Sequence, residues 1–381
     1  MTRNIRKLVW PIVASCVAFA AAAQAHARGT AEKSPVAFVY VGSGEIYAFA
    51  AAADGRLTPL PGSPFPAKVY PTAVSSGYLF ATDGTYIYSY SIASDGAIKL
   101  VFAIDAKQYN DPPGSGALSS LFPDRTGATL YDQDIYCCED NDAYQFFRVD
   151  NSTGRLTYLG VSYQATDFNV PMTFIGNNGY AYGASTDYYF HYFDTIYGFR
   201  RRKDGKLTVL GGVWELPLAP PGYGYEVYLT SADPTNHVAI SVQAIDGNFH
   251  NYGLPQLATY TAHADGNLAT TSTFWNMPTT ANQYVSALAM SPSGKLLAVG
   301  GSNGLQVFHF NGGNPITHYT GLITKDEIDQ VSWDNDNHLY AISTKSSKLF
   351  VFTVTPTSHH QAPGSPYAIT TPWSISVVPK R

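Results

Sequence analysis

Apolar and polar residues alternate with a period of two along most of the chain, in short runs separated by turn-forming residues. The clearest runs are rich in β-branched and aromatic residues: AFVYVG, YLFATD, ATLYDQ, YAYGAS, VAISVQ, LLAVGG and LYAIST. This alternation is typical of β-strands with one buried face. Beyond residue 27 no run has the apolar spacing of a helix, so the pattern predicts an all-β protein.

A second pattern follows each of these runs. It is an apolar residue, two further positions and an aromatic residue, and then a glycine-containing turn such as DGRLTPL, SDGAIKL, STGRLTYL or KDGKLTVL. The turn and the extended run after it predict a strand–turn–strand connection. The apolar and aromatic pairs are Ile46/Phe49, Ile87/Tyr90, Tyr144/Phe147, Ile196/Phe199, Leu257/Tyr260, Leu305/Phe308 and Leu349/Phe352. Together with the strand that precedes most of the runs, they predict a four-stranded unit, with strands A to D, that occurs seven times.

The two ends of the chain complete each other. The first unit begins with a B strand and has no A strand, whereas the chain ends with an unattached A-like strand, PWSISVVPK (Pro372 to Lys380). Both terminal units also carry a Pro-Gly-Ser-Pro-aromatic phrase, in DGRLTPLPGSPFPA and QAPGSPYAI. We predict a seven-bladed β-propeller of four-stranded antiparallel blades over residues 28–381, with the ring closed by the C-terminal strand completing the first blade.

The first 27 residues have the features of a secretory signal. A basic start is followed by an apolar, alanine-rich run that ends in small residues, which predicts cleavage after Ala27 and a periplasmic or secreted protein. An uncleaved anchor is the alternative, and VASC (Val13 to Cys16) fits a lipoprotein box only loosely. No later apolar stretch is long enough to cross a bilayer, so we expect no membrane span after cleavage.

Composition and charge limit the classes of partner and ligand that we expect the protein to bind. Charged residues make up 13% of the chain, the net charge is −5 and no basic patch stands out, so we expect no nucleic-acid partner. Cys137 and Cys138 are adjacent, and reduced thiols are favoured over a strained disulfide between them. DNDNH (Asp334 to His338) resembles a calcium loop but occupies the place of a tight turn in other units. We expect a monomer with no metal and no cofactor.

Two stretches carry a family resemblance. VYVGSGEIYAF with DGRLTPLPGSPFP, and VSALAMSPSGKLLAVGGSNGLQVFHF, resemble the bacterial seven-bladed propeller lactonases, whose namesake is the propeller-type 6-phosphogluconolactonase. The resemblance covers essentially the whole chain after the signal. It implies a metal-independent lactonase with a site of His, Arg and Glu at the channel mouth. The family's Gly-Pro-Arg-His and Asn-Glu-Leu segments do not occur here, so no catalytic residue can be assigned by matching.

Strand order predicts where chemistry would lie. The D–A and B–C connections form one face, the top, and three B–C loops on it are enlarged, at residues 134–142, 186–194 and 244–255. Alignment of the A strands places Tyr284, Glu226 and Glu327 at equivalent positions at the channel mouth. Either carboxylate could be a general acid or base if burial or mutual repulsion raised its pKa, and His191 is a further candidate base. The alternative is that both glutamates are solvated or hydrogen-bonded loop residues.

Two hypotheses of function follow. The first is a lactonase-like hydrolase that opens a sugar or small aliphatic lactone without a metal. The second is a non-catalytic secreted propeller that binds a glycan or protein partner through its tyrosine-rich top loops. Candidate ligand-binding residues on the top face are Tyr70, Tyr225, Tyr284, Asp329, Trp373 and His250.

Overall fold

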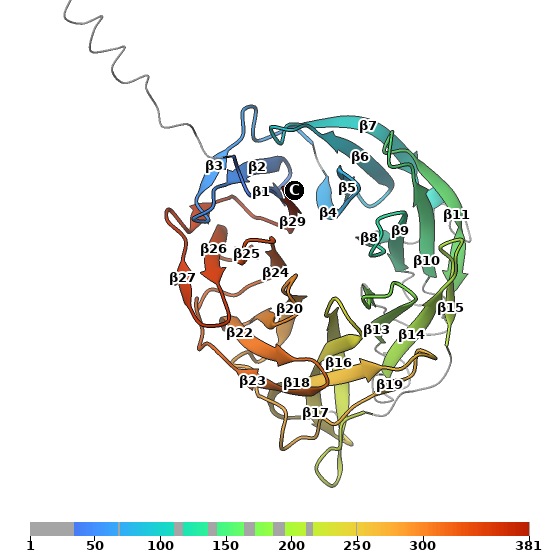
Figure 1. Ribbon diagram of the computed structural model, residues 1–381, viewed down its shortest axis with the longest axis vertical. Helices are drawn as coiled ribbons and strands as arrows, with labels where there is room; N and C mark the ends of the chain where they lie inside the picture. The colour runs from blue at the N-terminus through green and yellow to red at the C-terminus, as the bar shows by residue number, and fades with distance from the viewer. Residues whose placement is uncertain are drawn as a thin grey trace, which may run out of the picture. The chain divides into compact units, whose positions relative to one another are not determined.

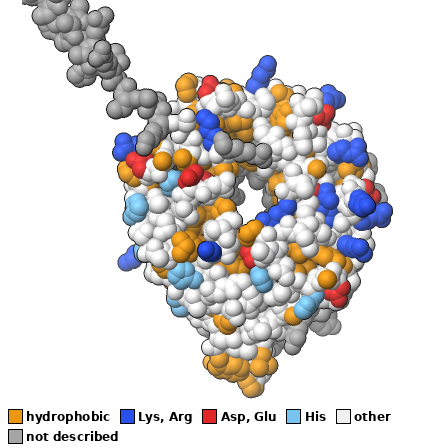
Figure 2. All heavy atoms as spheres, in the orientation of Figure 1, with side chains coloured by type: hydrophobic (Ala, Val, Ile, Leu, Met, Phe, Trp, Pro, Cys, Tyr) orange, Lys and Arg blue, Asp and Glu red, His pale blue; other side chains and the backbone are white. Residues whose placement is uncertain are grey.

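The computed structural model describes residues 34–67, 69–109, 117–135, 143–163, 172–185, 195–210, 216–248 and 250–380. Within these residues, seven antiparallel sheets stand around a central opening (Figures 1 and 2), which confirms the predicted seven-bladed propeller. The predicted signal segment, the Cys137–Cys138 pair and His191 lie outside the described residues. No helix in the described residues is long and apolar enough to cross a membrane.

The blades follow one another along the chain, and each runs from an inner strand at the channel to an outer strand. Blade one contains β29 (Ser374–Pro379), β1 (Ala37–Gly42), β2 (Ile46–Ala51) and β3 (Leu57–Pro59); blade two, β4 (Tyr70–Ser75), β5 (Tyr78–Thr82), β6 (Tyr86–Ile92) and β7 (Ile98–Asp105); blade three, β8 (Ala117–Pro123), β9 (Thr129–Ile135), β10 (Ala143–Val149) and β11 (Leu156–Tyr163); blade four, β12 (Thr173–Phe174), β13 (Tyr180–Ser185), β14 (Thr195–Arg201) and β15 (Leu207–Val209). Blade five contains β16 (Tyr223–Ala232), β17 (His237–Asp246), β18 (Asn251–Ala262) and β19 (Leu268–Ala269); blade six, β20 (Val285–Met290), β21 (Leu296–Gly301), β22 (Gly304–Asn311) and β23 (Asn314–His318); blade seven, β24 (Gln330–Trp333), β25 (His338–Ser343), β26 (Lys348–Val354) and β27 (His359–Gln361), with β28 (Tyr367–Ala368) also beside β26.

The ring closes as predicted. The C-terminal strand β29 pairs antiparallel with β1, and Val377 stands opposite Val39. Backbone hydrogen bonds continue this ladder at both ends, from Trp373 N–H to the carbonyl of Gly42 at 2.8 Å and from Lys380 N–H to that of Val36 at 2.7 Å. The tail therefore supplies the inner strand that blade one lacks.

The repeated turn glycine has a structural cause. Gly96, in the turn between the third and fourth strands of blade two, has a φ of 88°, and a Cβ there would lie 2.5 Å from the ring of Phe38 in blade one. The hydroxyl of Tyr40 donates to the Gly96 carbonyl at 2.7 Å. The same bond joins later blades, from Tyr131 to Gly205 at 2.6 Å and from Tyr182 to Gly266 at 2.8 Å. Each of these turns thus fastens a blade to the one before it.

The Pro-Gly-Ser-Pro phrase ends an outer strand. In blade one the Ser63 hydroxyl accepts the N–H of Ala48 at 2.8 Å, and in blade seven the Ser365 hydroxyl accepts that of Val351 at 2.9 Å. The serine oxygen replaces the carbonyl that a longer outer strand would have offered. Blades five and six reach the same result with Ser272 and Thr320, which accept from Thr259 N–H and Val307 N–H.

Three local features differ from expectation. Residues 107–109 form a short 3₁₀ helix, η1 (Lys107–Tyr109), where only strands and loops were predicted. Most of 244–255 belongs to β17 and β18, so this segment is a longer hairpin rather than an enlarged loop. The described parts also include a basic cluster (Figure 2), formed around the β14–β15 turn by Arg200, Arg202, Lys203 and Lys206. The expectation of no basic patch was therefore wrong, because a low overall charge does not prevent local clustering in one hairpin. The absence of a nucleic-acid partner stays a prediction.

Candidate functional site

The upper mouth of the channel carries large exposed aromatic side chains. Trp373 precedes β29, Tyr70 begins β4 and Tyr284 precedes β20, so each lies where the chain enters an inner strand. Their exposed fractions are 54%, 41% and 48%. The inner strands β20, β24, β29 and β4 contact one another in that order around the channel. We call the region formed by Tyr70, Tyr284, Trp373, Glu327 and Lys345 the upper mouth.

Glu327 is the centre of a hydrogen-bonded cluster at the upper mouth. Its carboxylate accepts the hydroxyl of Tyr284 from the neighbouring blade, and Lys345 Nζ lies 3.1 Å from its Oε2. The Tyr284 hydroxyl and the Lys345 ammonium hold the pKa of Glu327 below its usual value, and the carboxylate in turn raises the pKa of Tyr284. At neutral pH the cluster therefore contains an ionised carboxylate, a protonated phenol and an ammonium.

The electrostatics of the Glu327 cluster limit the acid–base chemistry that the upper mouth can perform. The sequence hypothesis required burial or repulsion to raise the pKa of a carboxylate, whereas the pKa of Glu327 is lowered. Glu327 is therefore a weak base and a good hydrogen-bond acceptor. Glu226, in β16, accepts the hydroxyl of Tyr228, and no hydrogen bond or ion pair joins it to Glu327 among the described residues. The structure brings together Tyr284 and Glu327 but not the two carboxylates.

Asp329 helps to position the backbone that leads to Trp373 at the upper mouth. Its Oδ2 accepts the N–H of Thr344 at 2.6 Å, and the hydroxyl of Thr344 donates to the carbonyl of Pro372, also at 2.6 Å. This chain of bonds fixes the backbone just before Trp373. We therefore assign Asp329 a positioning role for Trp373 rather than direct contact with a ligand.

Two further candidates have structural explanations. Tyr225 is only 1% exposed and packs in the core of blades four and five, where burial raises its pKa to about 12. His250 is exposed, and it closes a turn in which Asp246 accepts its backbone N–H at 2.9 Å and lies 3.1 Å from its Nδ1. Asp-x-x-x-His recurs at residues 233–237 and 334–338 with the same bonds. This spacing was visible in the sequence and indicates a turn motif.

Sequence reasoning missed an aromatic surface on blade five. Rings of Tyr223 and Tyr252 lie 4.4 Å apart, Tyr252 and Phe274 5.6 Å, and Phe274 and Trp275 6.0 Å between centroids. Trp275 is 66% exposed. Leu218 is 64% exposed, and its carbonyl accepts the backbone N–H of Phe274, the residue before Trp275. These five residues form what we call the blade-five aromatic surface. They come from three separate segments, so only the long strands β16 to β18 could have hinted at it.

No metal centre is apparent in the parts of the chain that the structure describes, because they hold no group of three or more His, Cys, Asp or Glu side chains with suitable geometry. In the calcium-like DNDNH segment, the carboxylate of Asp334 is already used by the backbone N–H groups of Asp336 and His338 and by the side chains of His338 and Tyr340. The segment is a tight turn.

Comparison with known proteins rests on structure alone, since no family model and no curated protein matches the sequence. A protein from Lactobacillus plantarum superposes with a TM-score of 0.65 at 13% identity, covering 90% of this chain and 99% of its own. Proposed 6-phosphogluconolactonases from Bacteroides fragilis and Bacteroides uniformis give TM-scores of 0.60 and 0.61 at 14% and 16% identity, covering 92% and 90% of this chain and 99% of their own. The fold is that of the lactonase-like seven-bladed propellers. At such identities the likeness shows the fold, and activity has to be argued from the site.

Proposed function

We propose that this protein binds a sugar or a small sugar lactone at the upper mouth and that lactone opening is the reaction this site would support. The observation that carries the proposal is the Tyr284–Glu327–Lys345 cluster beside the exposed ring of Trp373. An aromatic face packs against the apolar face of a sugar ring, while a carboxylate and an ammonium bond to its hydroxyl and carbonyl oxygens.

Ring opening would proceed by water addition. The Glu327 carboxylate takes a proton from a water molecule while the oxygen of that water bonds to the lactone carbonyl carbon. Lys345 would stabilise the negative charge that develops on the carbonyl oxygen. The ring C–O bond then breaks, and the leaving ring oxygen takes the proton back to become a hydroxyl. The lowered pKa of Glu327 makes it a weak base, so we expect slow turnover relative to binding.

The test is a pH-indicator assay with a panel of sugar and aliphatic lactones, combined with tryptophan fluorescence to follow binding near Trp373. We expect Glu327→Gln to lower turnover at least tenfold and Trp373→Ala to weaken binding. Glu45→Gln is the matched control, because Glu45 is an exposed glutamate in the B–C turn of blade one. Unchanged turnover in Glu327→Gln would remove Glu327 from the reaction. No binding and no turnover with any lactone would overturn the proposal.

A second candidate function is glycan binding without catalysis, and the blade-five aromatic surface favours it. A row of neighbouring aromatic rings, tilted to one another and ending in an exposed tryptophan, offers several aromatic contacts for sugar units. Electrophoresis through gels containing soluble polysaccharides measures such binding as retardation. We expect Trp275→Ala and Tyr252→Ala to abolish the retardation and Tyr86→Ala, an exposed tyrosine in blade two, to preserve it. Equal retardation of all three variants would rule this surface out.

A further inference from the structure

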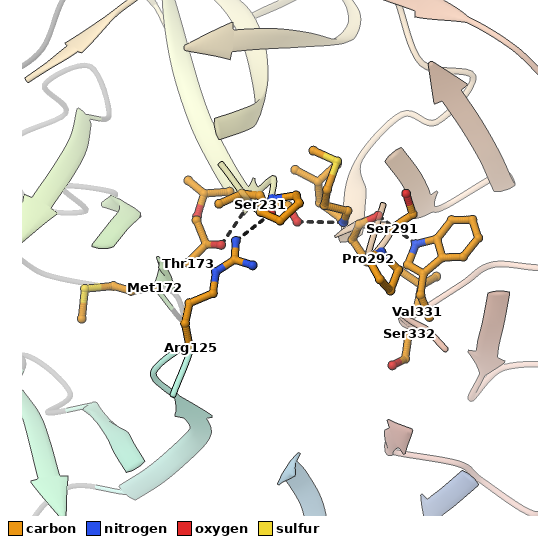
Figure 3. A pocket seen from close by; sticks show the side chains of 15 residues that line it. Arg125, Met172, Thr173, Ser231, Ser291, Pro292, Val331 and Ser332 are labelled. Carbon is orange, nitrogen blue, oxygen red and sulfur yellow. Dashed lines mark hydrogen bonds between the residues drawn. The ribbon is translucent and has the colours of Figure 1, made fainter. Parts of the chain in front are cut away.

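The lower end of the channel holds a cavity of about 440 Å³ that no catalytic hypothesis uses (Figure 3). It lies between the lower ends of the inner strands of blades four to seven and the first turn of blade three. Its described lining includes one cation and several hydroxyl groups, and none of the described lining residues is acidic. The polar residues are Arg125, Thr173, Thr230, Ser231, Ser291 and Ser332.

Arg125 is held in place by neutral groups. Its Nε donates to the carbonyl of Phe174 at 2.7 Å and its Nη2 to the carbonyl of Asp233 at 2.5 Å, so it reaches from blade three to blades four and five. No carboxylate of the described chain forms an ion pair with it. Asp233, whose charge acts on Arg125, directs its carboxylate to Thr235 and His237. Burial lowers the pKa of Arg125 and the charge of Asp233 opposes this, but a guanidinium stays charged.

Part of this guanidinium remains available. Its bonds to the described residues use Nε and Nη2, and in Figure 3 the other terminal nitrogen points toward the middle of the cavity. Ser332 lies across the opening from Arg125, with Ser231 and Ser291 along the rim between them. The Ser332 hydroxyl makes no hydrogen bond to the described residues. Two donors therefore face one space from opposite sides.

We infer that this cavity is a binding site for a small oxyanion, a carboxylate or a phosphate. The free terminal nitrogen of Arg125 can donate a charge-assisted hydrogen bond to an oxygen of such an ion, and serine hydroxyls supply further donors. The protein as a whole carries a net charge of −5, which disfavours non-specific anion binding. Binding at this place would thus depend on the local donors. The site is at the opposite end of the channel from the upper mouth and is independent of the proposed function.

A purely structural role for Arg125 is the competing explanation. The inner strand of blade four, β12, has only two residues, and Arg125 bridges the blades on either side of it. Arg125→Gln could therefore destabilise the ring whether or not an anion binds. Ser332→Asp separates the two roles, because it places a negative charge in the cavity without touching the bonds of Arg125. Its thermal unfolding should remain close to that of the wild type.

Isothermal titration calorimetry at constant ionic strength measures the binding. Inorganic phosphate is the ligand in one series of titrations and citrate in the other. We expect saturable binding of at least one anion, weakened tenfold or more in Ser332→Asp and in any Arg125→Gln protein that folds. Arg56→Gln, which removes an exposed arginine of blade one, should bind as the wild type does.

The comparison of the two series identifies the ligand class, since a preference for phosphate or for citrate shows which oxyanion fits. Binding of neither anion would overturn the inference. So would binding that Ser332→Asp leaves unchanged, or binding that Arg56→Gln weakens as much as Ser332→Asp, because each would place the anion elsewhere.

Discussion

The first turns of blades seven and five are built on the same motif and differ in how much of it is buried. In both, the aspartate accepts the backbone N–H of the histidine four residues later, at 2.9 Å for Asp334 and 3.0 Å for Asp233. The side-chain contacts also match, at 2.7 Å to His338 and 2.9 Å to His237. The His338 side chain is nevertheless only 1% exposed, against 24% for His237.

The difference arises from the neighbouring blade. Above His338 lie Gly55 and Ala362, from blades one and seven, at the place where the ring closes. Tyr340 adds a hydroxyl to the Asp334 carboxylate at 2.9 Å, whereas Ala239 has the equivalent place in blade five. The Asp-x-x-x-His motif determines the backbone conformation of the turn. Packing against the neighbouring blade determines how much the motif contributes to the free energy of unfolding.

Removal of the aspartates should separate the two turns most strongly. We expect Asp334→Ala to lower the free energy of unfolding by about 3–5 kcal/mol, because it leaves His338 buried without its partner. Asp233→Ala should cost only about 1–2 kcal/mol, since water can reach His237. Denaturant unfolding of both variants measures the difference. Equal losses would show that burial is not what distinguishes the turns.

The glycines that cover the histidines provide a second contrast. Both have positive φ, 79° for Gly55 and 63° for Gly312, so alanine costs about 1–2 kcal/mol at either from backbone strain. A Cβ at Gly55 would also lie 2.8 Å from the Cβ of Ala362 and 3.1 Å from the His338 ring, whereas at Gly312 the nearest atom is 3.2 Å away in the partly exposed ring of His237. We expect a total loss of about 2–4 kcal/mol for Gly55→Ala, with overpacking added.

Thermal and denaturant unfolding of Gly55→Ala and Gly312→Ala would test this ranking. Gly77→Ala is a suitable reference, because Gly77 also has a positive φ but has open space where its Cβ would be. A Gly55→Ala protein as stable as Gly77→Ala would mean that the contacts at the closure of the ring relax without cost.

Much of the fold was predictable because its signals are local. Period-two alternation and turn glycines such as Gly96 repeat along the chain, and the unpaired tail from Pro372 has only one blade to complete. The burial of His338 was not predictable, because it depends on residues nearly three hundred positions away in sequence, around Gly55. Contacts between blades decide it, and one sequence does not display them.

The candidate site was predictable in part for the same reason. Alignment on the turns placed Tyr284, Glu226 and Glu327 at equivalent positions at the channel mouth, and the structure joins Tyr284 to Glu327 but not to Glu226. It could not show that Tyr225 points into the core, because a shift of one residue along a strand reverses the face on which a side chain lies. The role of Lys345 likewise follows from a neighbouring loop rather than from any motif.

A smaller effect should follow from the hydroxyl that only the buried turn possesses. Tyr340→Phe removes one hydrogen bond to the charged Asp334, and we expect a loss of about 1.5–2 kcal/mol. Tyr131→Phe is the matched control, because its hydroxyl donates to the neutral carbonyl of Gly205 and should be worth about 1 kcal/mol. Denaturant unfolding would distinguish them, and a larger loss in Tyr131→Phe would contradict the special role of the blade-seven network.

The smallest effect expected is a pH dependence that belongs to the buried pair. Burial opposes charge on both groups, but their mutual bonds prevail, so the pKa of Asp334 is lowered and that of His338 is raised. The contribution of Asp334 is therefore present above its unfolded pKa of about 3.9 and lost as pH falls through the lower folded value. The contribution of His338 is complete below its unfolded pKa of about 6.5 and lost as pH rises through the higher folded value.

The pair should accordingly stabilise the protein most between about pH 4 and pH 6.5, and this advantage should decline toward pH 8 by on the order of 1 kcal/mol. Denaturant unfolding at several pH values, compared with the double variant Asp334→Asn/His338→Gln, isolates the effect from other titrating groups. A wild-type advantage that grows from pH 6 to pH 8 would mean that His338 is neutral in the folded protein. The buried turn would then act as a hydrogen-bonded pair like any other, and burial alone would account for its contrast with blade five.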